Sequence, residues 1–217
     1  MTARIVYPIE AIYGAHLRSP ESDIGHYLPF LREHAKGNIL EIGVRGGAST
    51  SAFLLGLDKN GGHLYSVDTE DCQIFAPHAN WSFLQGNSRD HKAVFDFVPA
   101  ELDVLFIDGD HSREGYVNDL HTYSKIVRTG GLIVSHDIDT SSNPGYTIEK
   151  GYPEAPSEAI RDEYFRFIEY NHCDHYELPG KVGLGVIVSG RANRIKNDAT
   201  PEELMRIATL VWEKTRR

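Results

Sequence analysis

Two acids and a histidine follow a short apolar run in the middle of the chain. The run 105–107 is followed at once by Asp108, Gly109, Asp110 and His111. A turn needs one Asp and one Gly, so turn formation does not explain the second acid or the imidazole. Because the unperturbed pKa of histidine is about 6.5, a neutral imidazole here could accept a proton near neutral pH. Asp108 and His111 are therefore candidate catalytic residues, unless Asp110 simply caps the next helix and leaves His111 in solvent.

A similar polar tip follows a later apolar run. His136 and Asp137 come directly after the sequence GGLIVS. In an open α/β sheet, ligands bind beyond the carboxyl ends of the strands. If both runs are parallel strands of one sheet, the tips at Asp108 and Asp137 converge on one crevice.

A glycine-rich turn follows the first strand-like run of the chain. In LEIGVRGGAS, Glu41 precedes Gly43, Gly46 and Gly47, and a helical segment comes next. Glycine lets a ligand approach the backbone closely, and the start of a helix offers unpaired N–H groups. The spacing differs from the G-x-G-x-x-G of dinucleotide-binding turns. An acid at this place would repel a pyrophosphate and attract an amino group or a sulfonium, although a tight strand-to-helix connection is an equally simple interpretation.

Two further strand-like runs end in polar residues that could contact a nucleoside. Asp68 ends the second run, at a distance along the chain that suits a carboxylate holding ribose hydroxyls. Asn87 and Ser88 follow the third run, and Asn87 could contact an adenine amino group. Each residue also has a plain alternative, because Asp68 could cap a helix and Asn87 could make a turn.

Strand-like and helical segments alternate along most of the chain. Strands are expected at 38–44, 62–68, 81–87, 102–108 and 130–138, and helices at 21–37, 48–60, 88–98, 113–130, 157–171 and 200–217. This alternation predicts an α/β fold with a Rossmann-like, doubly wound, mostly parallel sheet. A Pro-Gly turn in the segment 174–190 predicts a C-terminal antiparallel hairpin. We expect a single domain over 1–217, with an irregular N-terminal arm at 1–22 and a lid or substrate loop at 139–160; Pro29 should either kink the first helix or mark its start.

The composition limits the classes of partner. The 217 residues include 22 basic and 31 acidic side chains, for a net charge of −9. This charge argues against nucleic acid or an anionic membrane as the partner and favours a small molecule. Two cysteines without metal-binding spacing, and no apolar run long enough for a bilayer, indicate a cytoplasmic protein. The N-terminal arm and the C-terminal segment with Trp212 are candidate interfaces of a homo-oligomer.

The combination of these motifs resembles class I S-adenosylmethionine-dependent methyltransferases. The resemblance rests on EIGVRGG, the aspartate after the second strand, GNS, IDGDH and GGLIVSHD, and it covers residues 24–190. The pairing of IDGDH with HD more narrowly resembles the macrocin and macrolide-sugar O-methyltransferases and the cephalosporin hydroxylase-type proteins.

The resemblance implies a role for each matching residue. The glycine turn with Glu41 would flank the methionine part of S-adenosylmethionine, Asp68 would hold the ribose, and Asn87 or Ser88 the adenine. In metal-dependent relatives, the acids that end the fourth and fifth strands bind a divalent cation. For this chain, the resemblance implies Mg²⁺ or Mn²⁺. The residues that match the cation site are Asp108, His136 and Asp137, with Asp108 also adjoining the cofactor. A nitrogen ligand at position 136 suits Mn²⁺, Fe²⁺ or Zn²⁺ better than Mg²⁺.

The expected activity is methyl transfer to a hydroxyl of a small molecule, such as a sugar or another natural product. His111 would take the hydroxyl proton as the oxygen attacks the sulfonium methyl, and a cation would fix the oxygen and lower its pKa. Two alternatives remain at this stage. One is a nicotinamide-dependent oxidoreductase, which the missing G-x-G-x-x-G disfavours, and the other is a non-catalytic module that binds the cofactor.

Overall fold

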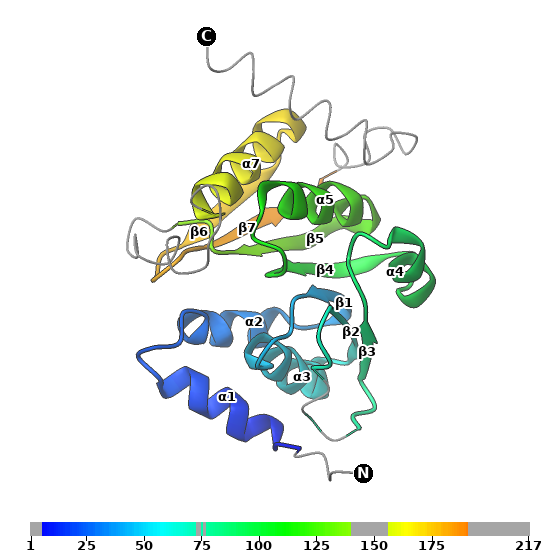
Figure 1. The fold of residues 1–217 in the computed structure, drawn as a ribbon, viewed down its shortest axis with the longest axis vertical. Helices are drawn as coiled ribbons and strands as arrows, with labels where there is room; N and C mark the ends of the chain where they lie inside the picture. Colours follow the sequence, from blue (N-terminus) through cyan, green and yellow to red (C-terminus); the bar gives the residue numbers. More distant parts are fainter. Residues whose placement is uncertain (1–5, 73–74, 76, 140–155, 191–217) are drawn as a thin grey trace.

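A seven-stranded sheet forms the centre of the protein (Figure 1). The computed structural model describes residues 6–72, 75, 77–139 and 156–190. The strands lie in the order β3-β2-β1-β4-β5-β7-β6, and their bounds are β1 Gly37–Ile42, β2 Gly62–Asp68, β3 Trp81–Gln85, β4 Leu102–Ile107, β5 Val127–His136, β6 Asp174–Leu178 and β7 Leu184–Val188. The first five strands run parallel, and β7 pairs antiparallel with both β5 and β6. The expected parallel sheet with a C-terminal antiparallel hairpin is confirmed.

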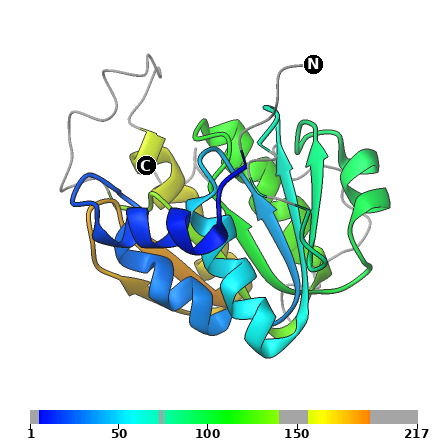
Figure 2. The same ribbon diagram turned by 90° about the horizontal axis from the view of Figure 1, so that it is seen from below.

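Helices cover both faces of the sheet, as Figures 1 and 2 show. One face carries α1 Ile9–Arg18, the 3₁₀ helix η1 Gly25–Tyr27, α2 Leu28–His34 and α3 Ala48–Asn60; the other carries α4 His91–Phe97, α5 Arg113–Tyr123, the 3₁₀ helix η2 Ser124–Ile126 and α7 Pro156–Asn171. Each layer encloses its own apolar core. Phe53 of α3 packs in the first core and Tyr116 of α5 in the second. The sheet is therefore buried on both faces, and its strand ends are left to form a site.

The N-terminal segment differs from the prediction. Residues 9–18 form helix α1, where an irregular arm was expected. Ile9, Ile12 and Tyr13 pack against the core that contains α3, and their spacing is that of one helix face. Further along, α2 begins at Leu28 with Pro29 in its first turn, so this proline marks a helix start and does not kink a longer helix.

Two predicted segments fall largely outside the described residues. Of the lid expected at 139–160, residues 140–155 are not described, and residues 156–160 belong to the start of α7. The helix expected at 200–217 is not described.

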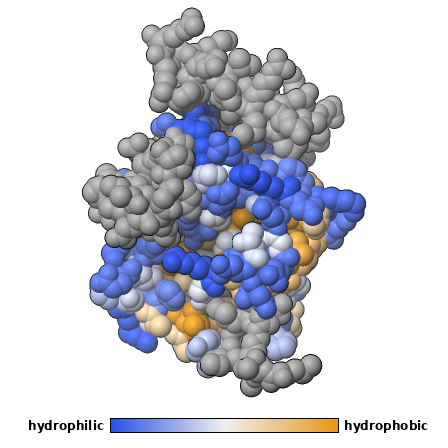
Figure 3. All heavy atoms as spheres, in the orientation of Figure 1, coloured by the Kyte–Doolittle hydropathy of each residue, from blue (hydrophilic) through white to orange (hydrophobic). Residues whose placement is uncertain are grey.

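Among the described residues visible in Figure 3, hydrophilic ones predominate. Among the helices that the structure describes, none combines the length and the apolar character that crossing a membrane would require.

The turn after β1 depends on a glycine. Gly43 has a φ of +93°, and its N–H donates to the carbonyl of Val67 over 2.9 Å. A Cβ at this position would lie 2.1 Å from the carbonyl oxygen of Asp108, which is far inside contact distance. The end of β4 can pass this close to the turn only because residue 43 has no side chain.

We expect Gly43→Ala to lower the free energy of unfolding by about 3 kcal/mol or more, because it combines a left-handed φ with a backbone overlap. Gly46→Ala is the matched control in the same turn. Its added Cβ would come no closer than 4.0 Å to any atom, the nearest being His16 Nε2, so the change should stay within about 1 kcal/mol. Urea denaturation of both variants measures the difference. Equal losses would show that the close approach at Gly43 is not what stabilises the turn.

Candidate active site

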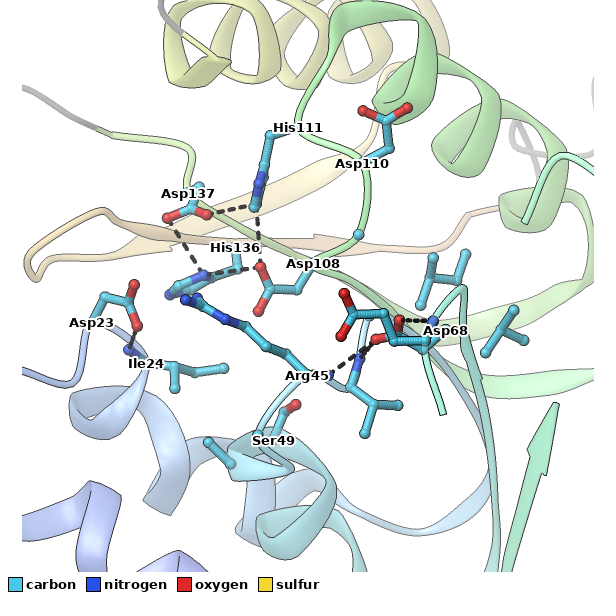
Figure 4. Close-up of a pocket in the computed structure, with 18 of the residues that line it drawn as sticks. Asp23, Ile24, Arg45, Ser49, Asp68, Asp108, Asp110, His111, His136 and Asp137 are labelled. Atoms are coloured by element: carbon cyan, nitrogen blue, oxygen red, sulfur yellow. Dashed lines mark hydrogen bonds and ion pairs between the residues drawn. The ribbon is translucent and has the colours of Figure 1, made fainter. Parts of the chain in front are cut away.

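The carboxyl ends of the central strands open into a cavity of about 1150 Å³ (Figure 4). Ile42 of β1 pairs with Ile107 of β4, and Ile107 pairs with Ser135 of β5. The residues that follow, Gly43, Asp108 and His136, therefore emerge beside one another. The predicted residues that line the cavity are Gly43, Gly46, Asp68, Asn87, Ser88, Asp108, His111, His136 and Asp137.

Asp68 holds the glycine turn in place. Its Oδ2 accepts hydrogen bonds from the backbone N–H groups of Val44 at 2.8 Å and Arg45 at 3.0 Å, and its Oδ1 accepts one from Glu70 at 2.9 Å. Burial raises the pKa of this carboxyl, but the backbone donors outweigh that effect and hold the pKa below its usual value. Asp68 is thus an ionised carboxylate at the rim of the cavity.

Glu41 lies behind the turn and is not among the residues that line the cavity. Its side chain is fully buried, and its carboxylate accepts hydrogen bonds from the hydroxyls of Ser49, Thr50 and Ser66, the shortest at 2.6 Å. Burial raises its pKa to about 7 despite these donors. The expected direct contact between Glu41 and a ligand is therefore replaced by a supporting position beneath the start of α3. Gly47 also lies outside the lining, as the N-cap of α3 with a φ of +74°.

The loop after β3 forms one wall of the cavity. Asn87 Oδ1 accepts a hydrogen bond from the N–H of Arg89 at 2.9 Å, which closes a tight turn. The carbonyl of Ser88 accepts a hydrogen bond from the Tyr123 hydroxyl of α5. The expected nucleoside contacts thus lie on a loop that is anchored to a helix.

Two carboxylates and two imidazoles meet at the ends of β4 and β5 (Figure 4). His111 Nε2 lies 2.7 Å from Asp137 Oδ2 and 3.4 Å from Asp108 Oδ1. His136 Nδ1 lies 3.4 Å from Asp108 Oδ1 and 3.5 Å from Asp137 Oδ1. The sequence prediction that these four residues converge is confirmed by these distances. Asp137 has a φ of +60°, a strained conformation that is common at functional sites.

The charges in this four-residue cluster depend on one another. Burial raises the pKa of Asp108 and Asp137, but the neighbouring imidazoles lower both values by more. Burial lowers the pKa of His111 and His136, but the two carboxylates raise both above the usual histidine value, to about 10 for His111. The two carboxylates thus favour the protonated form of the imidazoles, and the imidazoles favour the ionised form of the carboxylates.

The cluster has the donor set of a divalent metal site. One ligand atom each from Asp108, His111 and Asp137 lies within 4.8 Å of the others. Two carboxylate oxygens and one nitrogen are compatible with a cation such as Mn²⁺. Asp137 Oδ1 and both ring nitrogens of His136 are buried and make no hydrogen bond within the described part of the chain, although Asp137 Oδ1 and His136 Nδ1 form an ion pair with each other. His136 Nε2 is therefore a polar atom that a further ligand could use. The compact group contains His111, whereas the sequence prediction chose His136 as the nitrogen ligand.

The sequence reasoning missed one wall of the cavity. His16, Ser22, Asp23 and Ile24 line it from the N-terminal segment, and His16 Nδ1 lies 3.0 Å from Ser22 Oγ. The prediction of an irregular arm overlooked the helical spacing of the apolar residues at 9–13, and nothing in the sequence placed this segment beside the glycine turn. In Figure 4, Asp23 lies at the same end of the cavity as His136, away from Asp68.

The sequence prediction also gave no role to Arg45, because it assigned the ligand contacts of this motif to the glycines. Figure 4 shows its side chain extending from the turn across the cavity toward His136. It has a φ of +48° and is the one Arg or Lys among the described residues that line the cavity, where acidic side chains predominate. The cavity is therefore acidic and suits a cationic ligand better than an anionic one.

Comparisons with known proteins agree with this description. Residues 40–138 match the family described as a methyltransferase domain. A stretch of 44 residues is 46% identical to the uncharacterized protein R132 of Acanthamoeba polyphaga mimivirus, and the match spans 20% of each chain.

Several solved structures share the fold. An O-methyltransferase from Bacillus cereus, solved in complex with SAH, is 18% identical over 83% of this chain and 90% of its own, with a TM-score of 0.58. MycE, from the mycinamycin biosynthetic pathway, is 17% identical over 90% of this chain and 58% of its own, with a TM-score of 0.60. TomG from Streptomyces achromogenes, solved with SAM, is 18% identical over 84% of this chain and 89% of its own, with a TM-score of 0.56.

At 17–18% identity, the likeness to solved structures establishes the fold alone. The family match concerns residues 40–138 and describes a methyltransferase domain. With the strand order 3-2-1-4-5-7-6, the chain has the fold of the class I methyltransferases, and its residues 40–138 are similar to a methyltransferase domain.

Proposed function

We propose that the protein transfers the methyl group of S-adenosylmethionine to a hydroxyl of a small molecule, such as a sugar or another natural product, with the help of a divalent cation. The observation that carries this proposal is the cluster of Asp108, His111, His136 and Asp137, which faces the glycine turn across one cavity. A protein that only bound the cofactor would not need such a cluster.

The proposed cofactor lies along the strand ends. Its ribose hydroxyls would be held by Asp68, whose carboxylate oxygens keep further lone pairs beyond the backbone N–H groups they already accept. Its adenine would lie against Asn87 and Ser88, and its methionine part over Gly43 and Gly46. The sulfonium then faces the cluster, whose acidic surroundings favour a positive charge.

In this scheme the acceptor enters between the cluster and the N-terminal wall at Asp23 and Ile24. The main work of the enzyme is to align oxygen, methyl carbon and sulfur and to exclude water. His111 is the proposed acceptor of the hydroxyl proton, because 14% of its side chain is exposed, whereas the side chain of His136, which contacts the same two carboxylates, is only 2% exposed. A divalent cation held by Asp108 and Asp137 would orient the acceptor oxygen, lower its pKa, and offset the charge that otherwise keeps a proton on His111.

Two of the similar structures support the chemistry without deciding the substrate. One MycE structure is described as a complex with Mg, SAH and mycinamycin VI, and the Bacillus cereus protein is described as an O-methyltransferase. This chain spans 58% of the length of MycE, so we take from it only the class of reaction.

The first test concerns the cofactor. We expect calorimetry to show binding of S-adenosylhomocysteine but not of NADH. Asp68→Asn should weaken S-adenosylhomocysteine binding by about 10- to 100-fold, because hydrogen bonds to a charged group contribute about 1.5–3 kcal/mol. The control is Asp58→Asn, because Asp58 is an exposed acid whose partners among the described residues are His78 and Asn80. Tighter binding of NADH than of S-adenosylhomocysteine would favour the oxidoreductase alternative.

The second test concerns turnover. Transfer of a labelled methyl group from S-adenosylmethionine to a panel of glycosides, macrolides and catechols should be detectable for the wild type. His111→Gln and Asp108→Asn should each lower the rate at least 100-fold, as expected for loss of a general base or of its partner. Both should change the Kd of S-adenosylhomocysteine less than about threefold. The exposed His26→Gln serves as the histidine control. An active His111→Gln variant would remove this residue from the proposed proton transfer.

The third test concerns the cation. We expect the wild type to bind Mn²⁺ in an electron paramagnetic resonance titration, and Asp108→Asn and Asp137→Asn to weaken that binding by about 100-fold, because each removes a charged ligand. Comparing His111→Gln with His136→Gln identifies the nitrogen ligand. Chelation should abolish turnover, and added Mn²⁺ should restore it. Full activity in chelator, with unchanged Mn²⁺ binding by both aspartate variants, would exclude the cation from the mechanism.

A further inference from the structure

The backbone directly after β5 has a strained conformation. Asp137 has a φ of +60°, and β5 ends at the residue before it. A residue other than glycine is strained in this region and keeps the conformation only where the surrounding structure enforces it. Asp137 is one of the two carboxylates of the cluster. The contacts that enforce its backbone conformation therefore also place its side chain.

The peptide group between Ile138 and Asp139 is fixed at both of its polar atoms. The carbonyl oxygen of Ile138 accepts a hydrogen bond from Arg161 Nη1 of α7 at 3.2 Å. The N–H of Asp139 donates over 2.7 Å to the carbonyl oxygen of Val182, in the turn between β6 and β7. The Ile138 side chain is also completely buried. Asp137 thus lies between a paired strand and an anchored peptide group, and its strained φ is the conformation that joins the two.

Arg161 is itself restrained in the position from which it makes this contact. Its guanidinium lies over the ring of Phe165, one turn further along α7, at 4.9 Å from the ring centroid. The same Nη1 lies 3.3 Å from Glu177 Oε2 of β6, so it is shared between a carboxylate and the Ile138 carbonyl. Arg161 therefore connects α7 and β6 to the end of β5.

We infer that Arg161 is a positioning residue for the cation site: by holding the Ile138 carbonyl, it keeps Asp137 in the left-handed conformation that brings its carboxylate to Asp108 and His111. In this conformation, Asp137 Oδ2 lies 2.7 Å from His111 Nε2. Arg161 is not among the residues that line the cavity, so it acts through Asp137 and does not touch the cation. The inference rests on the proposed function, because it uses the cation site assigned there to Asp108 and Asp137.

The affinity for Mn²⁺ tests this role without any need for turnover. In the electron paramagnetic resonance titration, Arg161→Met should raise the Kd of Mn²⁺ by about tenfold, because a charge-assisted hydrogen bond to the backbone is lost and Asp137 is less often in place. Arg161→Lys keeps a charged donor and should stay within about threefold of the wild type. The Kd of S-adenosylhomocysteine should change less than about twofold in both variants, because Asp68 lies away from this strand end (Figure 4).

Arg128→Met is the matched control. Arg128 lies near the start of β5, at the opposite end from the cluster, and its side chain is 36% exposed, close to the 42% of Arg161. It also contacts a carboxylate and a backbone carbonyl, those of Asp103 and Thr129. Its loss should lower the stability to heat but leave the Kd of Mn²⁺ within about twofold of the wild type, because it shares no partner with Asp137.

A double-mutant cycle tests the path through Asp137. Asp137→Asn alone removes the charged ligand. Arg161→Met should then add less than about twofold to the Kd of Mn²⁺ in the Asp137→Asn background, since the two residues act as one unit. A further loss of about tenfold in that background would show that Arg161 acts on the cation by another route, and it would overturn the inference.

The outcomes separate this inference from the proposed function. No binding of Mn²⁺ by the wild type would contradict the cation of the proposed function. Normal binding by the wild type, with Arg161→Met less stable to heat but unchanged in its Kd for Mn²⁺, would overturn the positioning role alone, and so would an equal loss of affinity in Arg128→Met. If Arg161→Met does not fold, Arg161→Gln takes its place, because glutamine is uncharged and its side chain is shorter. An unchanged Kd in Arg161→Gln would overturn the inference as well.

Discussion

A buried and a half-buried carboxylate can share one edge of a sheet at close range only if positive charge offsets them. Asp108 and Asp137 are brought together by the pairing of β4 with β5, and the protein supplies His111 and His136 as the compensating charges. The same negative field that raises the pKa of these imidazoles would attract a divalent cation and a sulfonium. The assembly of charge at these strand ends thus connects the fold, the expected cofactor and the expected chemistry.

The glycine turn opposite this cluster is held by acids that serve different purposes. Glu41 is sealed among three hydroxyls beneath α3, where it orders the start of the helix. Asp68 is ionised at the rim and accepts the N–H groups of the turn. The hydrogen bonds of Glu41 and Asp68 thus order the turn before a ligand binds. This order lowers the entropic cost of binding.

The sequence predicted most of the sheet because the apolar runs and their polar ends were both visible. The bounds 62–68 and 48–60 agree with β2 and α3, and the strand-end rule correctly brought together the predicted cluster. The rest depended on three-dimensional packing. Nothing in the sequence showed that Glu41 would be covered by α3, that α1 would bring His16 beside the glycine turn, or that Arg45 would cross the cavity. Arg161 could not be distinguished from any other helix arginine, because its partners Ile138 and Glu177 lie 23 and 16 residues away along the chain.

Helix α5 connects the proposed proton acceptor with the loop proposed to hold the adenine. Its N-cap Ser112, whose Oγ accepts a hydrogen bond from the N–H of Gly115 at 3.0 Å, comes directly after His111. About three turns later, the Tyr123 hydroxyl donates a hydrogen bond to the carbonyl of Ser88, on the loop after β3. A helix rises 1.5 Å per residue and bends little over this length. One rigid element therefore sets the distance between the group proposed to accept the proton and the wall proposed to hold adenine, so a displacement of α5 would disturb cofactor binding and catalysis together.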